Sequence, residues 1–171
     1  MPVSLLKWFS LFILPLVVVA GPKQTVKRYD SPDKSLYAVV VTVTSDTLGP
    51  ESSVELRRAN GDFIGKRNFF SRIHGGGLGV INARWSLDSQ FFVFSTIASG
   101  GMSGGKFPTY FYSRHKNKIL QLDPIVGMWI TDPEFYLQSG DLITVTVHDT
   151  LPNGVVADTI SRSVHLSQFI K

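Results

Sequence analysis

Residues 36–44 read LYAVVVTVT, and this stretch decides the fold class. It is dense in β-branched and aromatic residues and shows no helical period, so it predicts a β-strand. Two more strand-like stretches follow, VELRRA at residues 54–59 and a return at residues 62–69, with Asn60-Gly61 between them. Because Asn-Gly favours a type I′ turn, in which both central residues have positive φ, we expect an antiparallel hairpin there.

The same order of strands and turns recurs further along the chain. Residues 91–96 (FFVFST), 109–113 (TYFYS) and 119–122 (ILQL) form a second group, with a polar turn at residues 114–118. A third group begins at residue 142 with LITVTVHD, whose alternation predicts one packed face and one partly hydrated face.

The C-terminal part continues the third group. Pro152-Asn153-Gly154 predicts a turn into a strand at residues 155–160, and the closing SVHLSQFIK fits either a strand or a short helix. No window combines helical apolar spacing with caps. The expected class is all-β, with about three antiparallel hairpin or sheet modules that are propeller-blade-like or form a small sandwich.

Each group opens on a similar tripeptide: Ser31-Pro32-Asp33, Ser86-Leu87-Asp88 and Ser139-Gly140-Asp141. The three openings are separated by 55 (86 − 31) and 53 (139 − 86) residues, which indicates an internal repeat. Ser bonds back to the local backbone and Asp accepts main-chain N–H groups, so we interpret the tripeptides as turn chemistry.

Two of these openings carry a resemblance. The segments SPDKSLYAVVV (31–41) and RWSLDSQFFVFST (84–96) resemble the Trp-Ser-Pro-Asp-Gly-Lys signature of the WD40-like, TolB-type propeller repeats of exported bacterial proteins. The chain is also similar to small uncharacterised exported bacterial β-proteins. The resemblance implies propeller-like antiparallel sheets and no particular substrate. A closed propeller needs at least four blades of about 40 to 45 residues, which exceeds the 151 residues from 21 to 171, so we expect no closed propeller.

Residues 1–20 have the form of a secretory signal peptide. Lys7 precedes an apolar run over residues 8–20, and Val18 and Ala20 supply the small residues wanted before a cleavage site. We expect cleavage after Ala20, a single domain over residues 21–171, and a periplasmic or secreted location; an uncleaved membrane anchor is the alternative. The chain has no cysteine, which excludes disulfides, thiolate catalysis, Cys-ligated metal and a lipobox.

The charge is modestly basic. The 171 residues carry a formal charge of +4 (17 − 13), or +3 (16 − 13) without Lys7, and the cations come in pairs rather than blocks. Nucleic acid is therefore not an expected partner. The widely separated histidines indicate no metal site, and we expect no cofactor.

Two loops match short sequence motifs of esterases. His74-Gly75-Gly76-Gly77 matches an oxyanion-hole string, and residues 101–105 (GMSGG) match G-x-S-x-G. This gives one hypothesis, a small secreted serine hydrolase using Ser103 with a His base. The acid and base candidates are Asp132 or Asp141 and His148 or His165. However, a strand follows Ser103 where the hydrolase elbow requires a helix.

A binding surface is the favoured interpretation of the same loops. Glycine-rich connections are exposed, and their backbone N–H groups suit a carboxylate or phosphate. If Phe111 points inward, Tyr110 and Tyr112 share an exposed face near Trp129, which suits sugar rings or a protein partner. The candidate binding residues are His74, Gly75, Gly76, Ser99, Gly100, Gly101, Met102, Ser103, Lys106, Tyr110 and Tyr112.

The expected function is therefore an exported, non-catalytic binding or interaction protein. Its partner would be an envelope or extracellular protein or a glycan, with the membrane involved only through the signal segment. A third hypothesis is structural: open sheet modules leave edges through which the chain forms oligomers.

Overall fold

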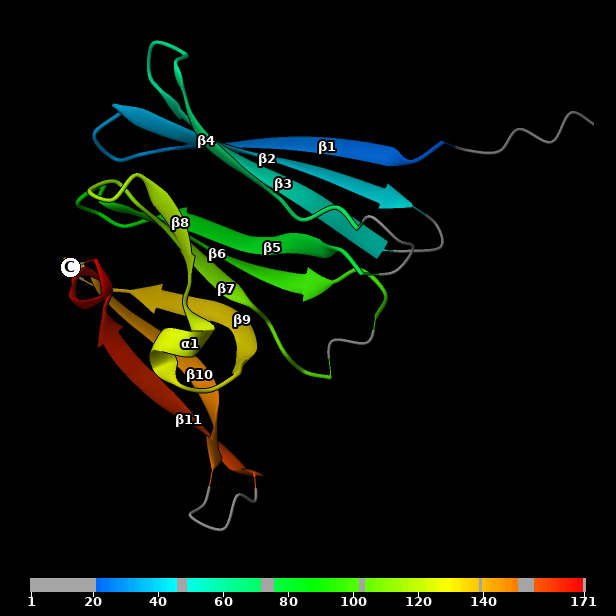
Figure 1. Cartoon of the computed structure of the whole chain (residues 1–171), viewed down its shortest axis with the longest axis vertical. Helices are drawn as coiled ribbons and strands as arrows, with labels where there is room; N and C mark the ends of the chain where they lie inside the picture. Colours follow the sequence, from blue (N-terminus) through cyan, green and yellow to red (C-terminus); the bar gives the residue numbers. More distant parts are fainter. Residues whose placement is uncertain are drawn as a thin grey trace, which may run out of the picture.

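The strand-forming stretch at residue 36 becomes β2 (Leu36–Ser45), an inner strand of the first of three antiparallel sheets. The computed structural model describes residues 21–45, 49–71, 76–101, 104–138, 140–150 and 156–170. Within them the three sheets have three or four strands each, and none closes on itself (Figure 1). The all-β class and the separate sheet modules are thus confirmed.

Each sheet is an antiparallel meander of consecutive strands. Sheet 1 has the order β1-β2-β3-β4, sheet 2 the order β5-β6-β7-β8 and sheet 3 the order β11-β10-β9. Sheets 1 and 2 comprise β1 (Lys23–Asp30), β2, β3 (Gly49–Arg58), β4 (Phe63–Asn68), β5 (Leu78–Trp85), β6 (Phe91–Ala98), β7 (Thr109–Ser113) and β8 (Lys118–Gln121). Sheet 3 comprises β9 (Ile130–Leu137), β10 (Leu142–Thr150) and β11 (Val156–His165).

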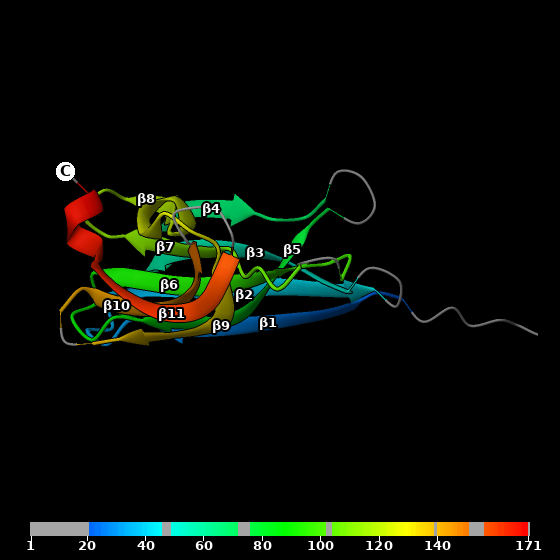
Figure 2. The same cartoon turned by 90° about the horizontal axis from the view of Figure 1, so that it is seen from below.

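The sheets stack in three layers with sheet 2 in the middle. Strands β1 and β9 lie along one side of the stack and β4 and β8 along the opposite side (Figure 2). One face of sheet 2 packs on sheet 1 through Phe92, Phe94 and Tyr110, and the other packs on sheet 3 through Phe91 and Val93. Burial on both faces explains why β6 is a nearly continuous apolar run rather than an alternating one.

Two short helices cover the core between sheets 2 and 3. Helix α1 (Asp123–Val126) follows β8, and the 3₁₀ helix η1 (Leu166–Phe169) follows β11. Val126 and Leu166 are buried among the residues of sheets 2 and 3. The C-terminal stretch therefore satisfies both alternatives left open by the sequence, since it is strand to His165 and helix after it.

The Ser-x-Asp turns form as the sequence predicts in sheets 1 and 2. Ser31 Oγ donates to Asp33 and accepts from the Leu36 N–H at 3.0 Å, and Ser86 Oγ donates to Asp88 and accepts from the Phe91 N–H at 2.9 Å.

The third opening differs. The Gln138 N–H bonds to the Leu142 carbonyl, whereas the Ser31 N–H bonds to that of Leu36, so the third turn is one residue shorter. Ser139 itself lies outside the described residues. Asp141 bonds to the Ser167 N–H and the His165 ring and so fixes the C-terminal helix.

The Asn60-Gly61 hairpin is present, but the expected type I′ turn is wrong. Gly61 has φ +95° whereas Asn60 has no positive φ. The Gly61 N–H donates to the Arg58 carbonyl, and the register shifts between Leu56 and Arg57. This is the three-residue loop with a left-handed glycine and a bulge, in which only the glycine needs positive φ.

Residues 1–20 lie outside the described residues, so the export signal stays a prediction. Among the residues that the structure describes, no helix is long and apolar enough to cross a membrane.

Candidate binding site

The two glycine-rich loops meet at a carboxylate of the chain itself. Glu51, on β3, accepts hydrogen bonds from the Ser71 N–H at 3.0 Å, the Ser71 hydroxyl at 2.8 Å and the Ser99 hydroxyl at 3.0 Å. The Gly77 N–H also bonds to Glu51, and the Ser99 N–H donates to the Gly77 carbonyl at 2.9 Å. Burial alone would raise the pKa of Glu51, but these hydrogen bonds outweigh it and hold the pKa below its ordinary value.

This arrangement changes the interpretation of the loops. Donors of Ser99 and Gly77, which the sequence offered to an external anion, already bind Glu51. His74, Gly75, Met102 and Ser103 lie outside the described residues. Gly76, Gly100 and Gly101 are exposed, as expected of a loop, but no described contact turns them toward a shared cavity.

Glycines at this end permit close approach of sheets 1 and 2. A Cβ at Gly79 would lie 2.5 Å from the Pro50 carbonyl oxygen, and one at Gly77 would lie 2.2 Å from the Glu51 carboxylate. The glycines therefore let this part of the chain approach the start of β3 closely.

The expectation that Tyr110 and Tyr112 are exposed is wrong. Only 5% and 3% of their surfaces are exposed, because sheet 1 covers the face of β7 that they occupy and sheet 3 covers the face of Phe111. Tyr110 stacks on Phe94 with ring centroids 5.5 Å apart. The pattern of β7 alone could not show that both of its faces are covered.

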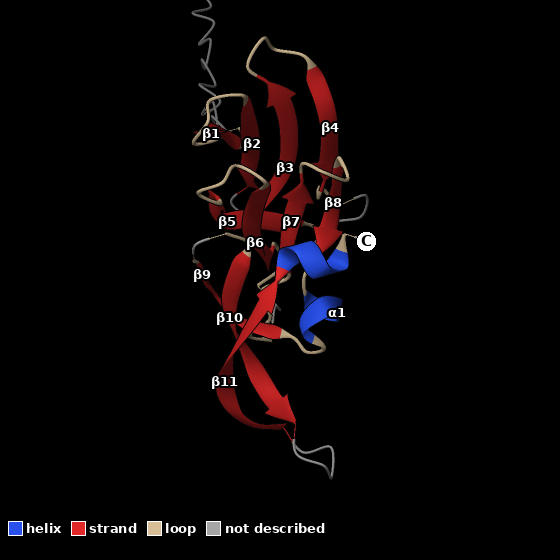
Figure 3. Ribbon diagram, turned by 90° about the vertical axis from the view of Figure 1, so that its left-hand side faces the viewer, coloured by secondary structure: helices blue, strands red, loops and turns tan. Residues whose placement is uncertain are grey.

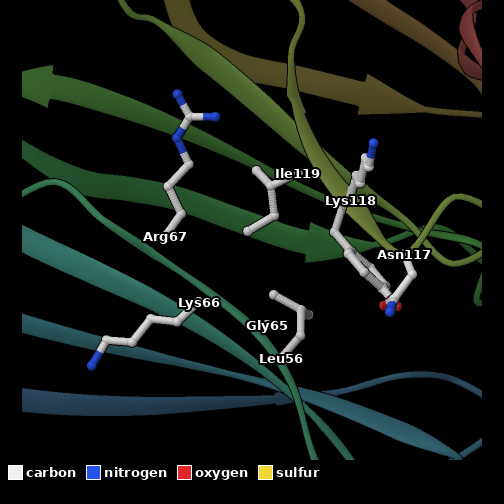
Figure 4. A pocket seen from close by; sticks show the side chains of 8 residues that line it. Leu56, Gly65, Lys66, Arg67, Asn117, Lys118 and Ile119 are labelled. Carbon is white, nitrogen blue, oxygen red and sulfur yellow. The ribbon is translucent and has the colours of Figure 1, made fainter.

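A cavity of about 290 Å³ opens between the outer strands of sheets 1 and 2, and we call it the basic cleft. Strands β4 and β8 border it along one edge of the stack (Figure 3). Its lining combines cations with an apolar floor and contains no carboxylate (Figure 4). The lining residues are Leu56, Gly65, Lys66, Arg67, Tyr112, Asn117, Lys118 and Ile119.

Arg67 is the central group of the basic cleft. Its guanidinium carbon lies 4.6 Å from the ring centroid of Tyr110 and 5.5 Å from that of Phe69. It is partly buried, yet among the described residues it makes no hydrogen bond or ion pair. Two aromatic rings therefore hold a guanidinium whose N–H donors have no acceptor among the described residues.

The neighbouring cations divide into paired and unpaired groups. Lys66 lies 3.9 Å from Glu55 and points away from Arg67 (Figure 4), and Arg114 bonds to Asp33 at 2.7 Å. Within the described part of the chain, Lys118 has no carboxylate partner. Burial raises the pKa of Tyr112, while the positive charges of Arg114 and Arg58 oppose that rise. The cleft is therefore lined by positively charged groups together with apolar ones.

Lys106 lies outside the basic cleft. Its Nζ is 3.0 Å from the ring centroid of Trp129, at a second cavity beside α1. Lys106 follows the glycine-rich loop directly in sequence, and its ammonium lies at the Trp129 ring rather than in the basic cleft. Among the described residues, no cluster of His, Asp and Glu could hold a metal ion.

Only some of the proposed hydrolase residues lie close to one another. His165 Nδ1 and Asp141 Oδ1 are 2.8 Å apart, but Asp141 lines a cavity together with Asp88, at the beginning of β6. The described neighbours of Ser103, Gly101 and Gly104, follow the other end of β6, which is eight residues long. Such a strand spans about 26 Å, so the Asp141–His165 pair does not serve that loop.

Comparisons with known proteins return no relative. No protein-family model matches the chain, and no curated protein is similar to it.

Proposed function

We propose that this protein is an exported, non-catalytic binding protein whose basic cleft takes a negatively charged ligand. One observation carries the proposal: Arg67 is a partly buried guanidinium in a cavity whose lining has no carboxylate. Export is inferred from residues 1–20, and it makes envelope and extracellular molecules the expected partners.

The chemistry of Arg67 favours an anion over a neutral ligand. A guanidinium offers five N–H donors in a fixed planar fork that matches a carboxylate or phosphate. Stacking on Tyr110 and Phe69 restricts the side chain before any ligand arrives, which lowers the entropy lost on binding. Lys118 and the Asn117 amide at the same cavity supply further donors.

The test is calorimetric titration of the full chain, purified after export from a bacterial host, with citrate and with tripolyphosphate. We expect binding that weakens with added salt, as contacts between charges do. Arg67→Gln should weaken it at least tenfold. Arg28→Gln is the matched control, because Arg28 also stacks on a tyrosine, 3.7 Å from the Tyr37 ring, but is paired with Asp30. Equal affinities of the two variants would refute the proposal.

The same preparations address export and catalysis. The mass of the exported protein should correspond to a chain that begins at Gly21. Ester hydrolysis that disappears in Ser103→Ala would contradict a non-catalytic role and would support the hydrolase hypothesis instead.

A further inference from the structure

A second cavity, of about 470 Å³, lies beside α1 and is named here the Trp129 cavity. Its lining combines an exposed aromatic ring, a cation, apolar groups, the Gln121 amide and the Asp123 carboxylate, which is buried and accepts a hydrogen bond from the Thr109 N–H. The lining residues are Lys106, Pro108, Gln121, Asp123, Pro124, Gly127, Met128 and Trp129.

Strand β8 joins the two cavities. Lys118 and Ile119, at its beginning, line the basic cleft, and Gln121, at its end, lines the Trp129 cavity. Three residues of strand cover about 10 Å. Figure 3 shows β8 at the edge of sheet 2 with α1 beyond its end, so both cavities lie on one side of the stack.

Arg67, in the basic cleft, lies over β7, the strand that pairs with β8. Its guanidinium packs over the ring of Tyr110, and Tyr110 is the register partner of Gln121. We call the surface along β8, from Lys118 at the basic cleft to Lys106 and Trp129 at the Trp129 cavity, the β8 track.

Trp129 gives this track a platform for a ring. Its surface is 56% exposed, which is unusual for so large an apolar side chain. Lys106 lies over the indole ring, and in the described part of the chain its ammonium has no carboxylate partner.

The frame around Trp129 is rigidly built. The Asp123 carboxylate accepts a hydrogen bond from the Thr109 N–H at 3.0 Å, and the Phe107 N–H donates to the Ile130 carbonyl at 2.8 Å. Arg162 bonds to the Val126 carbonyl at the end of α1. Three chain segments are thus fixed around a site that presents an exposed aromatic face beside a half-buried cation.

From this track we infer that the ligand is an acidic polysaccharide, bound along β8 from the basic cleft to the Trp129 cavity. Its carboxylates pair with Arg67, Lys118 and Lys106, and the apolar face of one pyranose ring stacks on Trp129. The inference rests on the proposed function, since the basic cleft is one of its two subsites. A peptide of acidic residues alone has the charges but no ring to place on Trp129, so the indole favours a sugar over such a peptide.

The experiment titrates the full exported chain with hexagalacturonate, with its methyl ester and with a hexaglutamate peptide. We expect hexagalacturonate to bind, and each of the other two to bind at least tenfold more weakly. Trp129→Ala should weaken hexagalacturonate binding at least tenfold and leave citrate binding unchanged. Tyr136→Ala is the matched control, because Tyr136 is 66% exposed and lines neither cavity.

The outcomes separate this inference from the proposed function. If Arg67→Gln weakens binding and Trp129→Ala does not, the anion site stands and the polysaccharide is refuted. If hexaglutamate binds as tightly as hexagalacturonate and ignores Trp129, the ligand is an acidic peptide and the inference is wrong. If neither variant changes the affinity for any probe, both the inference and the proposed function fail.

Discussion

Gly79→Ala tests the close approach of sheets 1 and 2. Gly79 lies in β5, and a Cβ there would be 2.5 Å from the Pro50 carbonyl oxygen and 2.8 Å from two carbons of its ring. The nearest of these atoms is backbone and the others belong to a proline ring. Unlike the Glu51 side chain beside Gly77, they cannot rotate away, so the start of β3 must move from β5.

The expected cost follows from the packing disturbed by this movement. Val54 and Leu56, further along β3, lie in the core with Phe94 and are at most 1% exposed. Forcing extra atoms into such a contact costs about 1 to 3 kcal/mol, and the backbone position of the clash places Gly79→Ala at about 3 kcal/mol. For a domain of this size, that lowers Tm by roughly 6 to 12 °C.

Gly65→Ala is the control for this prediction. Gly65 also lies in a strand, β4, but nothing is within 4 Å of a Cβ built on it. Reduced freedom of the unfolded chain should make this variant as stable as the wild type or more stable by up to about 1 kcal/mol. Urea unfolding with a common m-value compares the pair. If Gly79→Ala is as stable as Gly65→Ala, the described approach of the two sheets is incorrect.

Two further predictions concern the turns. Burial alone would raise the pKa of Asp141, but hydrogen bonds from Ser167 and His165 hold that pKa at about 2. The ionised carboxylate therefore stabilises the folded protein fully above pH 4, near the ordinary pKa of Asp, and this stabilisation is lost as the pH falls toward 2. Asp141→Asn should therefore lower the free energy of unfolding at pH 7 by about 1 to 2 kcal/mol and flatten its decrease between pH 4 and 2; a decrease as steep as in the wild type would contradict this assignment. Lys34 has φ +59°, a conformation that favours glycine, so Lys34→Gly should stabilise the protein by up to about 1 kcal/mol. The control Lys27→Gly, within β1, should destabilise it by about 0.5 to 1 kcal/mol. Urea midpoints that shift equally for both variants would argue against strain at Lys34.

The sequence predicts most of the strands because their signals are local. Residues 36–44 and 142–149 become strands whose packed residues alternate as expected. Strand β1 escapes prediction because it is an exposed edge strand with the polar sequence KQTVKRYD, which its pairing with β2 stabilises. Strands β5 and β9 contain few long apolar runs and likewise depend on their neighbours.

The binding site is harder to predict because two layers build it. Lys66-Arg67 looks like an ordinary pair of surface cations, but consecutive strand residues face opposite ways. Lys66 therefore joins Glu55, whereas Arg67 stacks on Tyr110 in the basic cleft. The alternation of side chains along β4 is enough to predict that Lys66 and Arg67 face opposite ways. The contact of Arg67 with Tyr110 depends on the stacking of sheet 1 on sheet 2, which the sequence does not show.

The most direct test of ligand binding along β8 is an NMR titration that observes the Arg67 side-chain Nε–H and the Trp129 indole N–H together. When hexagalacturonate is added to the full exported chain, we expect both signals to shift and to give the same Kd. The Arg28 Nε–H signal should not shift. Unchanged Arg67 and Trp129 signals at saturating hexagalacturonate would contradict a binding track along β8.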